Sequence, residues 1–192
     1  MKRFLLSLFL SAVFAGILSA AEAAWFSKKF PAELINASGK KVSTATALQG
    51  KMVAVYFSAS WCGPCRGFTP KLVNFYKRVA KKNNLEIVFI SSDKTPKAMM
   101  QYMKKDRMPW LAVPQDDPLA KALKSELKVS GIPTLVVFDQ NGKLISKEAR
   151  MDVVKLGAKA MAAWKSSDYK PLTSQNVEKN SKSKRKSKNK NK

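Results

Sequence analysis

The chain has 192 residues, of which 36 are lysine or arginine and 13 are aspartate or glutamate, giving a formal charge of +23. This length accommodates one domain with a hydrophobic core, but not two ordinary domains together with the terminal extensions described below. The sequence has no histidine and only two cysteines. These absences exclude a four-ligand zinc site, a histidine haem ligand and a Ser-His-Asp nucleophile within one chain.

Residues 1–23 are typical of a signal peptide. A basic start precedes an apolar run over residues 4–18, and small residues follow up to Ala23, which matches the regions that signal peptidase requires. A retained membrane anchor is the alternative, but about fifteen apolar residues are fewer than the roughly twenty of a spanning helix. We therefore expect cleavage after Ala23, with Ala21 or Ala24 as alternative last residues. The protein would then be secreted across the inner membrane, into the periplasm or the cell envelope.

Residues 24–49 form a lead-in of mixed character, in which we expect a short strand at 33–37. The run over 52–58 is continuously apolar and rich in β-branched and aromatic residues, which predicts a strand buried on both faces. From Pro64 onward, apolar residues recur every three or four positions opposite a lysine-rich side. This period predicts a helix that ends at the asparagine pair 83–84.

The second half of the chain continues the alternation of strands and helices. In order, we expect a strand at 85–91, a helix at 96–105, an apolar connection at 109–114, a short helix at 119–127, a strand at 135–139, a return strand at 144–147 and a final helix at 152–164. A strand-helix-strand crossover implies parallel strands, whereas the tight Asn-Gly turn before the return strand leaves room only for an antiparallel pair. The sequence thus predicts an α/β domain with a mixed sheet.

The two cysteines lie in the segment Trp61-Cys-Gly-Pro-Cys-Arg66, between the first buried strand and its helix. Thiols at this spacing can alternate between dithiol and disulfide within one helical turn, and a helix N-terminus favours the thiolate. A bridge between them closes only a four-residue loop, and because crosslink stabilisation grows with loop length, a structural role is disfavoured. We interpret Cys62 as the nucleophile and Cys65 as the thiol that resolves the mixed disulfide.

Taken in order, these motifs resemble the thioredoxin superfamily over about residues 50–164. The tryparedoxin and nucleoredoxin branch is resembled most by four segments: Phe57-Ser-Ala-Ser-Trp-Cys-Gly-Pro-Cys-Arg66, Phe68-Thr-Pro70, Ser91-Ser-Asp93 and Met108-Pro-Trp-Leu-Ala-Val-Pro114. With the signal peptide, the chain resembles a secreted bacterial-type member. The resemblance implies a thioredoxin fold of the α/β class, with a central mixed β-sheet flanked by helices on both faces. We assign this domain to residues 50–165.

The resemblance also implies roles for individual residues. Cys62 and Cys65 would form the redox-active disulfide, with Cys65 buried, and Trp61 would cover the site. Gly63 and Pro64 would set the turn into the helix. In the segment Gly131-Ile-Pro-Thr134, Pro133 would be a cis-proline that faces the disulfide, and the backbone of Ile132 would present its polar groups to an incoming peptide. A cis bond before proline costs only about 0.5–1 kcal/mol relative to trans.

Two positions depart from the pattern of the family. Ordinary thioredoxins have a buried Asp–Lys pair for proton transfer from the resolving cysteine, and the matching positions here are Tyr56 and Phe89. A water molecule, or a hydroxyl such as that of Tyr56, would have to replace the pair. Tryparedoxins have two prolines between their cysteines, whereas this chain has Gly63-Pro64, which leaves the redox potential open.

We expect a thiol–disulfide oxidoreductase that reduces disulfides in extracytoplasmic proteins through a Cys62/Cys65 cycle. A disulfide oxidase or isomerase is the alternative, and a copper(I) carrier that uses the two thiolates belongs to a different class. The expected partners are disulfide-bearing proteins and an upstream electron donor, which in an oxidising compartment would be membrane-bound. We expect no cofactor, no bound metal and a monomer.

Residues 166–192 are predicted to form a disordered, lysine-rich tail. Only Asn, Ser, Lys and Arg occur over 179–192, and such a segment buries too little apolar surface to offset its ordering entropy. The tail could tether the protein to an anionic surface of the envelope, bind nucleic acid through its phosphates, or only solubilise the chain. Because of the predicted signal peptide, we expect no specific nucleic-acid partner.

Overall fold

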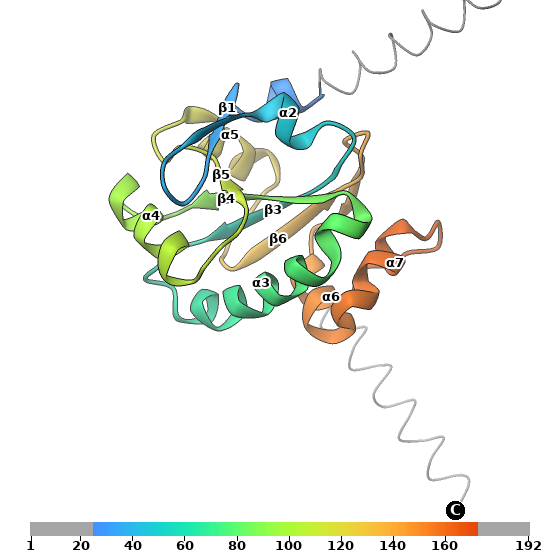
Figure 1. Cartoon of the computed structure of the whole chain (residues 1–192). Coiled ribbons are helices and arrows are strands. Elements are labelled where there is room, and N and C mark those ends of the chain that lie inside the picture. Colours follow the sequence, from blue (N-terminus) through green and yellow to red (C-terminus); the bar gives the residue numbers. More distant parts are fainter. Residues whose placement is uncertain (1–24, 173–192) are drawn as a thin grey trace, which may run out of the picture.

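The computed structural model describes residues 25–172, which fold around a seven-stranded β-sheet (Figure 1). The predicted signal peptide and residues 173–192 lie outside the described residues. The strands are β1 (Glu33–Ile35), β2 (Lys41–Ser43), β3 (Met52–Ser58), β4 (Leu85–Ser91), β5 (Leu111–Ala112), β6 (Thr134–Phe138) and β7 (Leu144–Ser146). Their order across the sheet is β2-β1-β5-β4-β3-β6-β7. Strands β3, β4 and β5 are parallel to one another and the other neighbours are antiparallel, so the sheet is mixed.

Helices cover both faces of this sheet. Besides the helical residues 25–29, they are α2 (Thr44–Leu48), α3 (Gly63–Asn83), α4 (Pro96–Lys105), α5 (Pro118–Glu126), α6 (Ala149–Leu156), the 3-10 helix η1 (Gly157–Lys159) and α7 (Ala160–Lys165). Figure 1 shows α3, α4, α6 and α7 on one side of the sheet and α2 and α5 on the other, and each side encloses its own apolar cluster. The predicted α/β fold with a central mixed sheet is confirmed. Within residues 25–172, no helix is long and apolar enough to cross a bilayer.

The side chains of β3 supply both apolar clusters. All seven residues of Met52–Ser58 are buried. Ala54 and Tyr56 join the cluster under α3, whereas Val53 and Val55 join the cluster on the opposite face. Because successive side chains of a strand point to opposite faces, a strand covered on both sides requires a continuous apolar run. The sequence-based prediction of this strand is confirmed at both ends.

Helix α3 follows β3 after a short loop, and this connection positions the cysteines. The N-cap residue of α3 is Cys62, and Pro64 occupies its first turn, where a missing backbone N–H costs little. Asn84 ends the helix in the left-handed conformation with φ of 50°, as the asparagine pair predicted. Because β3 ends at Ser58 and α3 begins at Gly63, the cysteine pair lies at the carboxyl end of the central strand.

Three short elements, β2, α2 and β5, were not predicted. They have three, five and two residues, which is too short for a hydrophobic period to emerge. Strand β5 lies within the segment 109–114, which we expected to be an apolar connection. It pairs with Val88 and Phe89 of β4. Its strand conformation therefore depends on hydrogen bonds to β4, which its own sequence does not indicate.

Gly157 divides the predicted final helix into three pieces. We expected one helix over 152–164, but α6 ends at Leu156 and α7 begins at Ala160, with η1 between them. Gly157 has a φ of +53°, and its N–H donates to the Val153 carbonyl as the C-cap of α6. A residue with positive φ commonly terminates a helix, and glycine adopts it without a steric cost.

The first residues of the predicted tail pack against the domain, which corrects the boundary drawn at residue 166. The hydroxyl of Tyr169 and the indole N–H of Trp164 both donate to Asp152, the latter at 2.8 Å. The backbone N–H of Leu172 also points to this carboxylate, at 3.4 Å. Asp152 is fully buried. The folded part therefore extends at least as far as Leu172, because residues 164–172 share a buried acceptor on α6 that the local sequence does not reveal.

We predict that Asp152→Ala lowers the free energy of unfolding by about 2–4 kcal/mol, because the buried Trp164 N–H loses its acceptor. Urea unfolding of the full chain measures this change. Asp168→Ala is the matched control, since Asp168 is exposed in the same segment, and it should change stability by less than about 0.5 kcal/mol. Equal effects of the two substitutions would contradict the bridging role of Asp152.

Candidate functional site

The cysteine pair forms a disulfide at the first turn of α3. Cys62 and Cys65 are joined through their sulfur atoms, and their Cα atoms are 5.2 Å apart. The Sγ atom of Cys62 accepts a hydrogen bond from the backbone N–H of Cys65, at 3.2 Å. Cys62 is 6% exposed and Cys65 is fully buried. An incoming reactant can therefore approach the first sulfur but not the second.

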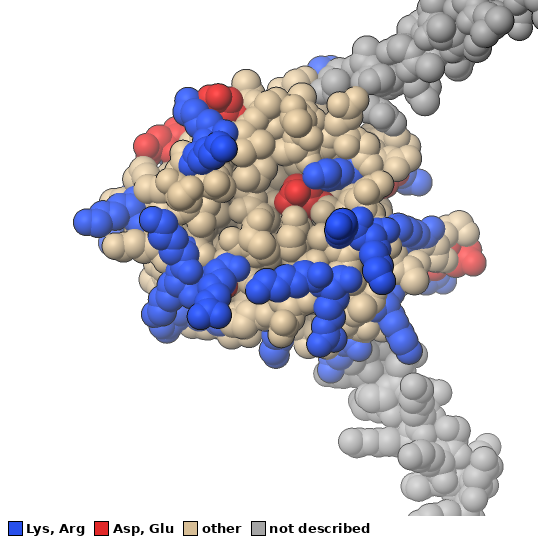
Figure 2. All heavy atoms as spheres, viewed as in Figure 1, with Lys and Arg blue, Asp and Glu red and all other residues tan. Residues whose placement is uncertain are grey.

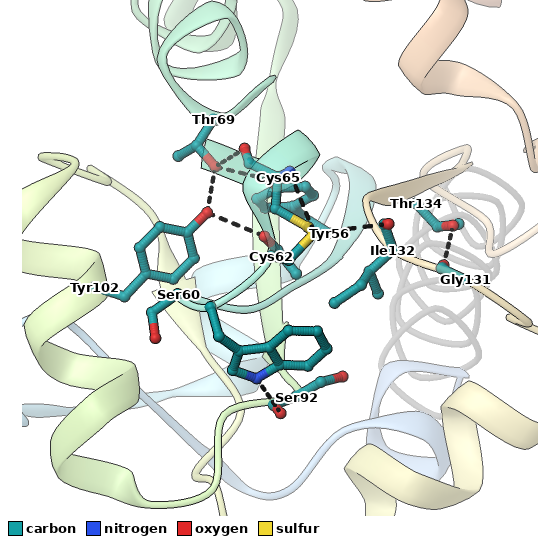
Figure 3. Close-up of a disulfide and its surroundings, with 12 residues drawn as sticks. Tyr56, Ser60, Cys62, Cys65, Thr69, Ser92, Tyr102, Gly131, Ile132 and Thr134 are labelled. Atoms are coloured by element: carbon teal, nitrogen blue, oxygen red, sulfur yellow. Dashed lines mark hydrogen bonds between the residues drawn. A yellow bond between two sulfur atoms is a disulfide. The ribbon is translucent and has the colours of Figure 1, made fainter. Parts of the chain in front are cut away.

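A loop that ends in a cis peptide bond faces Cys62. The bond between Ile132 and Pro133 is cis, and the carbonyl oxygen of Ile132 lies 3.7 Å from Cys62 Sγ (Figure 3). The disulfide sulfur carries no proton, so this is a contact here, whereas a reduced Cys62 thiol could donate to the carbonyl. Thr134 Oγ1 donates to the Gly131 carbonyl across the proline, at 2.7 Å. The structure thus brings the predicted Ile132 and Pro133 to the disulfide.

Trp61 lies at the rim of the site. Its indole N–H donates to the carbonyl of Ser92 at 3.2 Å, and 61% of the residue is exposed. Gly63 and Pro64 are exposed in the first turn of α3. The aromatic face of Trp61 is therefore available to a reactant that approaches Cys62, and all seven predicted site residues gather at one end of the sheet.

A buried carboxylate braces the loop that carries Trp61. Asp93, which is 5% exposed, accepts hydrogen bonds from the backbone N–H and the hydroxyl of Ser60, at 2.9 and 2.6 Å. Its second carboxylate oxygen accepts from Ser91 Oγ at 2.8 Å. The side-chain amide of Gln115 donates to the Asp93 carbonyl. This carboxylate thus joins the end of β4 to the loop between β3 and α3.

Four buried hydroxyls lie behind Cys65. Thr69 Oγ1 lies 2.8 Å from the hydroxyl of Tyr56 and 2.6 Å from that of Tyr102. Tyr102 also contacts Ser58 Oγ, at 3.1 Å. Thr69 donates its own proton to the carbonyl of Cys65, at 2.9 Å. Figure 3 shows Thr69 and Tyr102 meeting beside the first turn of α3.

The chemistry of these groups determines which of them donates in each hydrogen bond. A carbonyl can only accept, so Thr69 uses its proton on Cys65, and both tyrosines must then donate to Thr69. Because Tyr102 has used its proton, Ser58 donates to Tyr102. Burial raises the pKa of Tyr56 well above its ordinary value, and the neighbouring Tyr102 adds to this effect. Tyr56 therefore stays protonated at neutral pH, and the network fixes the backbone of Cys65. Phe89, which occupies the other position of the missing Asp–Lys pair, is the neighbour of Tyr56 on β4.

Charged groups lie at the beginning of α3 and at the end of α4. Arg66 is exposed, one residue after Cys65. Burial raises the pKa of the Asp106 carboxyl at the end of α4, while Lys105 and Arg66 oppose this rise. The end of α4 therefore lies beside the beginning of α3. In the part of the chain that the structure describes, no three Cys, His, Asp or Glu side chains gather as a metal-ligand group.

Sequence reasoning gave no role to the supporting residues Thr69, Tyr102, Ser58 and Ser60, although all except Tyr102 lie in segments that resemble the family. Thr69 follows Cys65 by four residues on the same helix, and this spacing is a signal that could have found it. Tyr102 lies on α4, and nothing in the local sequence indicates that it meets α3. Asp93 belongs to the segment Ser91-Ser-Asp93 that resembles the family, and the structure shows that its carboxylate fixes the loop before Cys62.

We predict that Tyr56→Phe destabilises the protein by about 1–2 kcal/mol at neutral pH, because a buried hydrogen bond is lost. The difference in stability between the variant and the unmodified chain should shrink above pH 10. Unfolded tyrosine loses its proton there while buried Tyr56 keeps it, so each unit of pH costs the native chain about 1.4 kcal/mol that the variant does not lose. Urea unfolding between pH 7 and 11 measures both effects, and parallel curves would show that Tyr56 ionises freely in the folded state.

Comparisons with known proteins agree with this geometry. The model of a family described as thioredoxin-like matches residues 50–144. Probable nucleoredoxin 1 of Arabidopsis thaliana is 44% identical over 128 residues, which are 66% of this chain and 22% of that protein. Tryparedoxin of Trypanosoma brucei brucei is 43% identical over 110 residues, 56% of this chain and 75% of that protein. The solved structure of tryparedoxin from Trypanosoma brucei covers 73% of this chain and 97% of its own, with 38% identity and a TM-score of 0.66.

The residues matched by the family model include Cys62 and Cys65, and the comparisons confirm the predicted thioredoxin fold. The chain spans less than a third of the length of the nucleoredoxins that it matches, whereas it covers most of tryparedoxin. The chain therefore belongs to the thioredoxin-like family of redox enzymes, with tryparedoxins and nucleoredoxins among its relatives.

Proposed function

We propose that this protein reduces disulfides in extracytoplasmic proteins through a Cys62/Cys65 dithiol–disulfide cycle. One observation carries the proposal. Cys62 is the N-cap residue of α3, with its sulfur 3.2 Å from the Cys65 amide, while Cys65 is enclosed. A backbone N–H directed at the sulfur stabilises the thiolate, which is the attacking form of a cysteine. The asymmetric exposure gives the two thiols different tasks.

The cycle has two exchange steps. The Cys62 thiolate attacks one sulfur of a substrate disulfide, which forms a mixed disulfide and releases the first substrate thiolate. Cys65 then loses its proton and attacks Cys62 Sγ, which breaks the mixed disulfide and releases the second substrate thiolate. The substrate gains two electrons, and the pair ends as the Cys62–Cys65 disulfide of this structure. A second dithiol must reduce this disulfide before the next cycle.

The rim of the site supports the approach of a peptide. Only Cys62 is accessible, and it lies between the exposed indole of Trp61 and the Ile132 carbonyl. A substrate chain that brings its sulfur to Cys62 would pass along the backbone before Pro133, while Trp61 offers an apolar surface beside it. Asp93 holds the Trp61 loop through Ser60, so this surface is pre-organised.

We further propose that the protein acts in the periplasm or at the cell envelope, as a monomer. The residue pattern of 1–23 supports secretion. An oxidising compartment requires an upstream donor of electrons, which would be membrane-bound. The lysine-rich tail would add attraction to an anionic envelope surface.

The direction of electron flow is decided by the redox potential of the pair. We predict a value near or below about −220 mV for the full chain, which favours reduction of substrates. Equilibration with glutathione buffers, read by the ratio of dithiol to disulfide protein, measures it. A value near about −120 mV would instead assign the oxidase or isomerase alternative.

We predict that Cys65→Ala accumulates mixed disulfides through Cys62, because the second exchange step is lost. The variant is incubated with a disulfide-bearing protein, and a species that a reductant dissociates is measured on non-reducing gels. Cys62→Ala is the matched control and should trap little, since the remaining Cys65 is fully buried. Equal trapping by the two variants would disprove the assignment of nucleophile and resolving thiol.

A further inference from the structure

Most of the positive charge of this protein belongs to its folded domain. Residues 25–172 contain 26 lysine and arginine residues and 11 aspartate and glutamate residues, a formal excess of 15 positive charges. The remaining residues therefore account for 8 of the total charge of +23. A basic tail alone does not explain this composition, and the surface of the domain itself requires an account.

The excess is concentrated in the helices that cover one face of the sheet. Helices α3, α4, α6 and α7 contain a single acidic residue, Asp152, which is fully buried and hydrogen-bonded to Trp164. The same helices carry twelve basic residues, which we call the basic layer: Arg66, Lys71, Lys77, Arg78, Lys81, Lys82, Lys97, Lys104, Lys105, Arg150, Lys155 and Lys165. All except the half-buried Arg150 are exposed. Acidic residues directly flank two of these helices, since Asp106 follows α4 and Glu148 precedes α6.

The described residues form no ion pair with the basic layer. The ion pairs among the described residues join Lys29 to Glu126, Lys41 to Glu33 and Lys51 to Glu86, and none of them uses a residue of the basic layer. In Figure 2, Lys and Arg side chains crowd the part of the surface over α3 and α4, where few acidic ones appear. Side chains that carry like charges on adjacent helices repel one another, so an anionic partner would relieve this repulsion.

The shape of the basic layer favours an extended partner. One described hollow, between the end of α3, the β6–β7 hairpin and α7, is lined by Lys82 and Lys165 of the basic layer, and the other lies along α5. The other ten residues of the basic layer line neither hollow. The exposed large apolar side chains are Trp61, Leu144 and Val154, so no row of aromatic residues is available to stack nucleic-acid bases. Away from that hollow, a broad basic surface fits a plane of anionic lipid headgroups, which attract each basic residue near them.

We propose that the basic layer is a docking surface for anionic lipid membranes. The surface is separate from the cysteine pair, so it does not depend on the direction of electron transfer. Cys62 is the N-cap residue of α3, which places the disulfide at one end of the layer rather than beneath it. A protein docked through these helices would keep Cys62 and the exposed Trp61 accessible at the border of the contact, within reach of disulfides in membrane-attached proteins.

The test compares two triple variants of the full chain with its tail intact. Lys71→Gln/Arg78→Gln/Lys81→Gln removes three charges from α3, and Lys28→Gln/Lys121→Gln/Lys128→Gln removes three exposed charges from the other side of the sheet. Binding is measured by co-sedimentation with vesicles of phosphatidylcholine, with and without phosphatidylglycerol. We expect the α3 variant to bind the anionic vesicles about a hundredfold more weakly than the unmodified chain, since each basic residue contributes roughly fivefold. The affinity of the control variant for the same vesicles should fall by less than about fivefold.

Three outcomes would overturn the proposal. Equal losses in the two variants would show that only total charge matters. Full retention of binding by the α3 variant, with loss on deletion of residues 179–192, would assign the contact to the tail. Binding to duplex DNA but not to anionic vesicles at the same salt would assign the surface to nucleic acid. Both variants should reduce a small soluble disulfide at the unmodified rate, which separates a failure of docking from a failure of the redox chemistry.

Discussion

The hydrogen bond from the Cys65 amide to the Cys62 sulfur connects the chemistry of this protein to its fold. A helix N-terminus has backbone N–H groups without intrahelical partners, and here a sulfur atom accepts one of them. The contact exists because α3 begins directly after the central strand β3. One short connection therefore buries Cys65, leaves Cys62 accessible and orients the groups that favour a thiolate.

Two buried polar networks hold this connection from opposite sides. Asp93 fixes the loop before Cys62 through Ser60, and the hydroxyl of Thr69 fixes the backbone of Cys65. Both networks are satisfied by side chains from other elements, β4 for the first and α4 for the second. Buried polar groups specify one arrangement of their partners, so the cysteine pair is held within a rigid frame. Tyr56 and Phe89 occupy the positions of the Asp–Lys pair of ordinary thioredoxins, but they do not replace its acid–base chemistry, because buried Tyr56 remains protonated.

The distribution of charge divides the molecule into two functional regions. The carboxyl end of β3 carries the disulfide with an apolar, partly enclosed rim, whereas the helices α3, α4, α6 and α7 present a surface of almost one sign. Helix α3 belongs to both regions, since its first turn holds the cysteines and its exposed side carries half of the basic layer. Membrane attachment through that side would orient the disulfide without blocking it.

Local patterns in the sequence determined the central strand β3, helix α3 and the cysteine pair, because long apolar periods and a motif of adjacent residues need no distant partner. They also indicated the cis peptide bond before Pro133, through the resemblance to a known family. Only the tertiary structure decided the strand β5, the packing of Tyr169 on Asp152 and the meeting of Tyr102 with Thr69. Each of these depends on a hydrogen-bond partner far away in the sequence, and such a partner leaves no periodic trace in the segment itself.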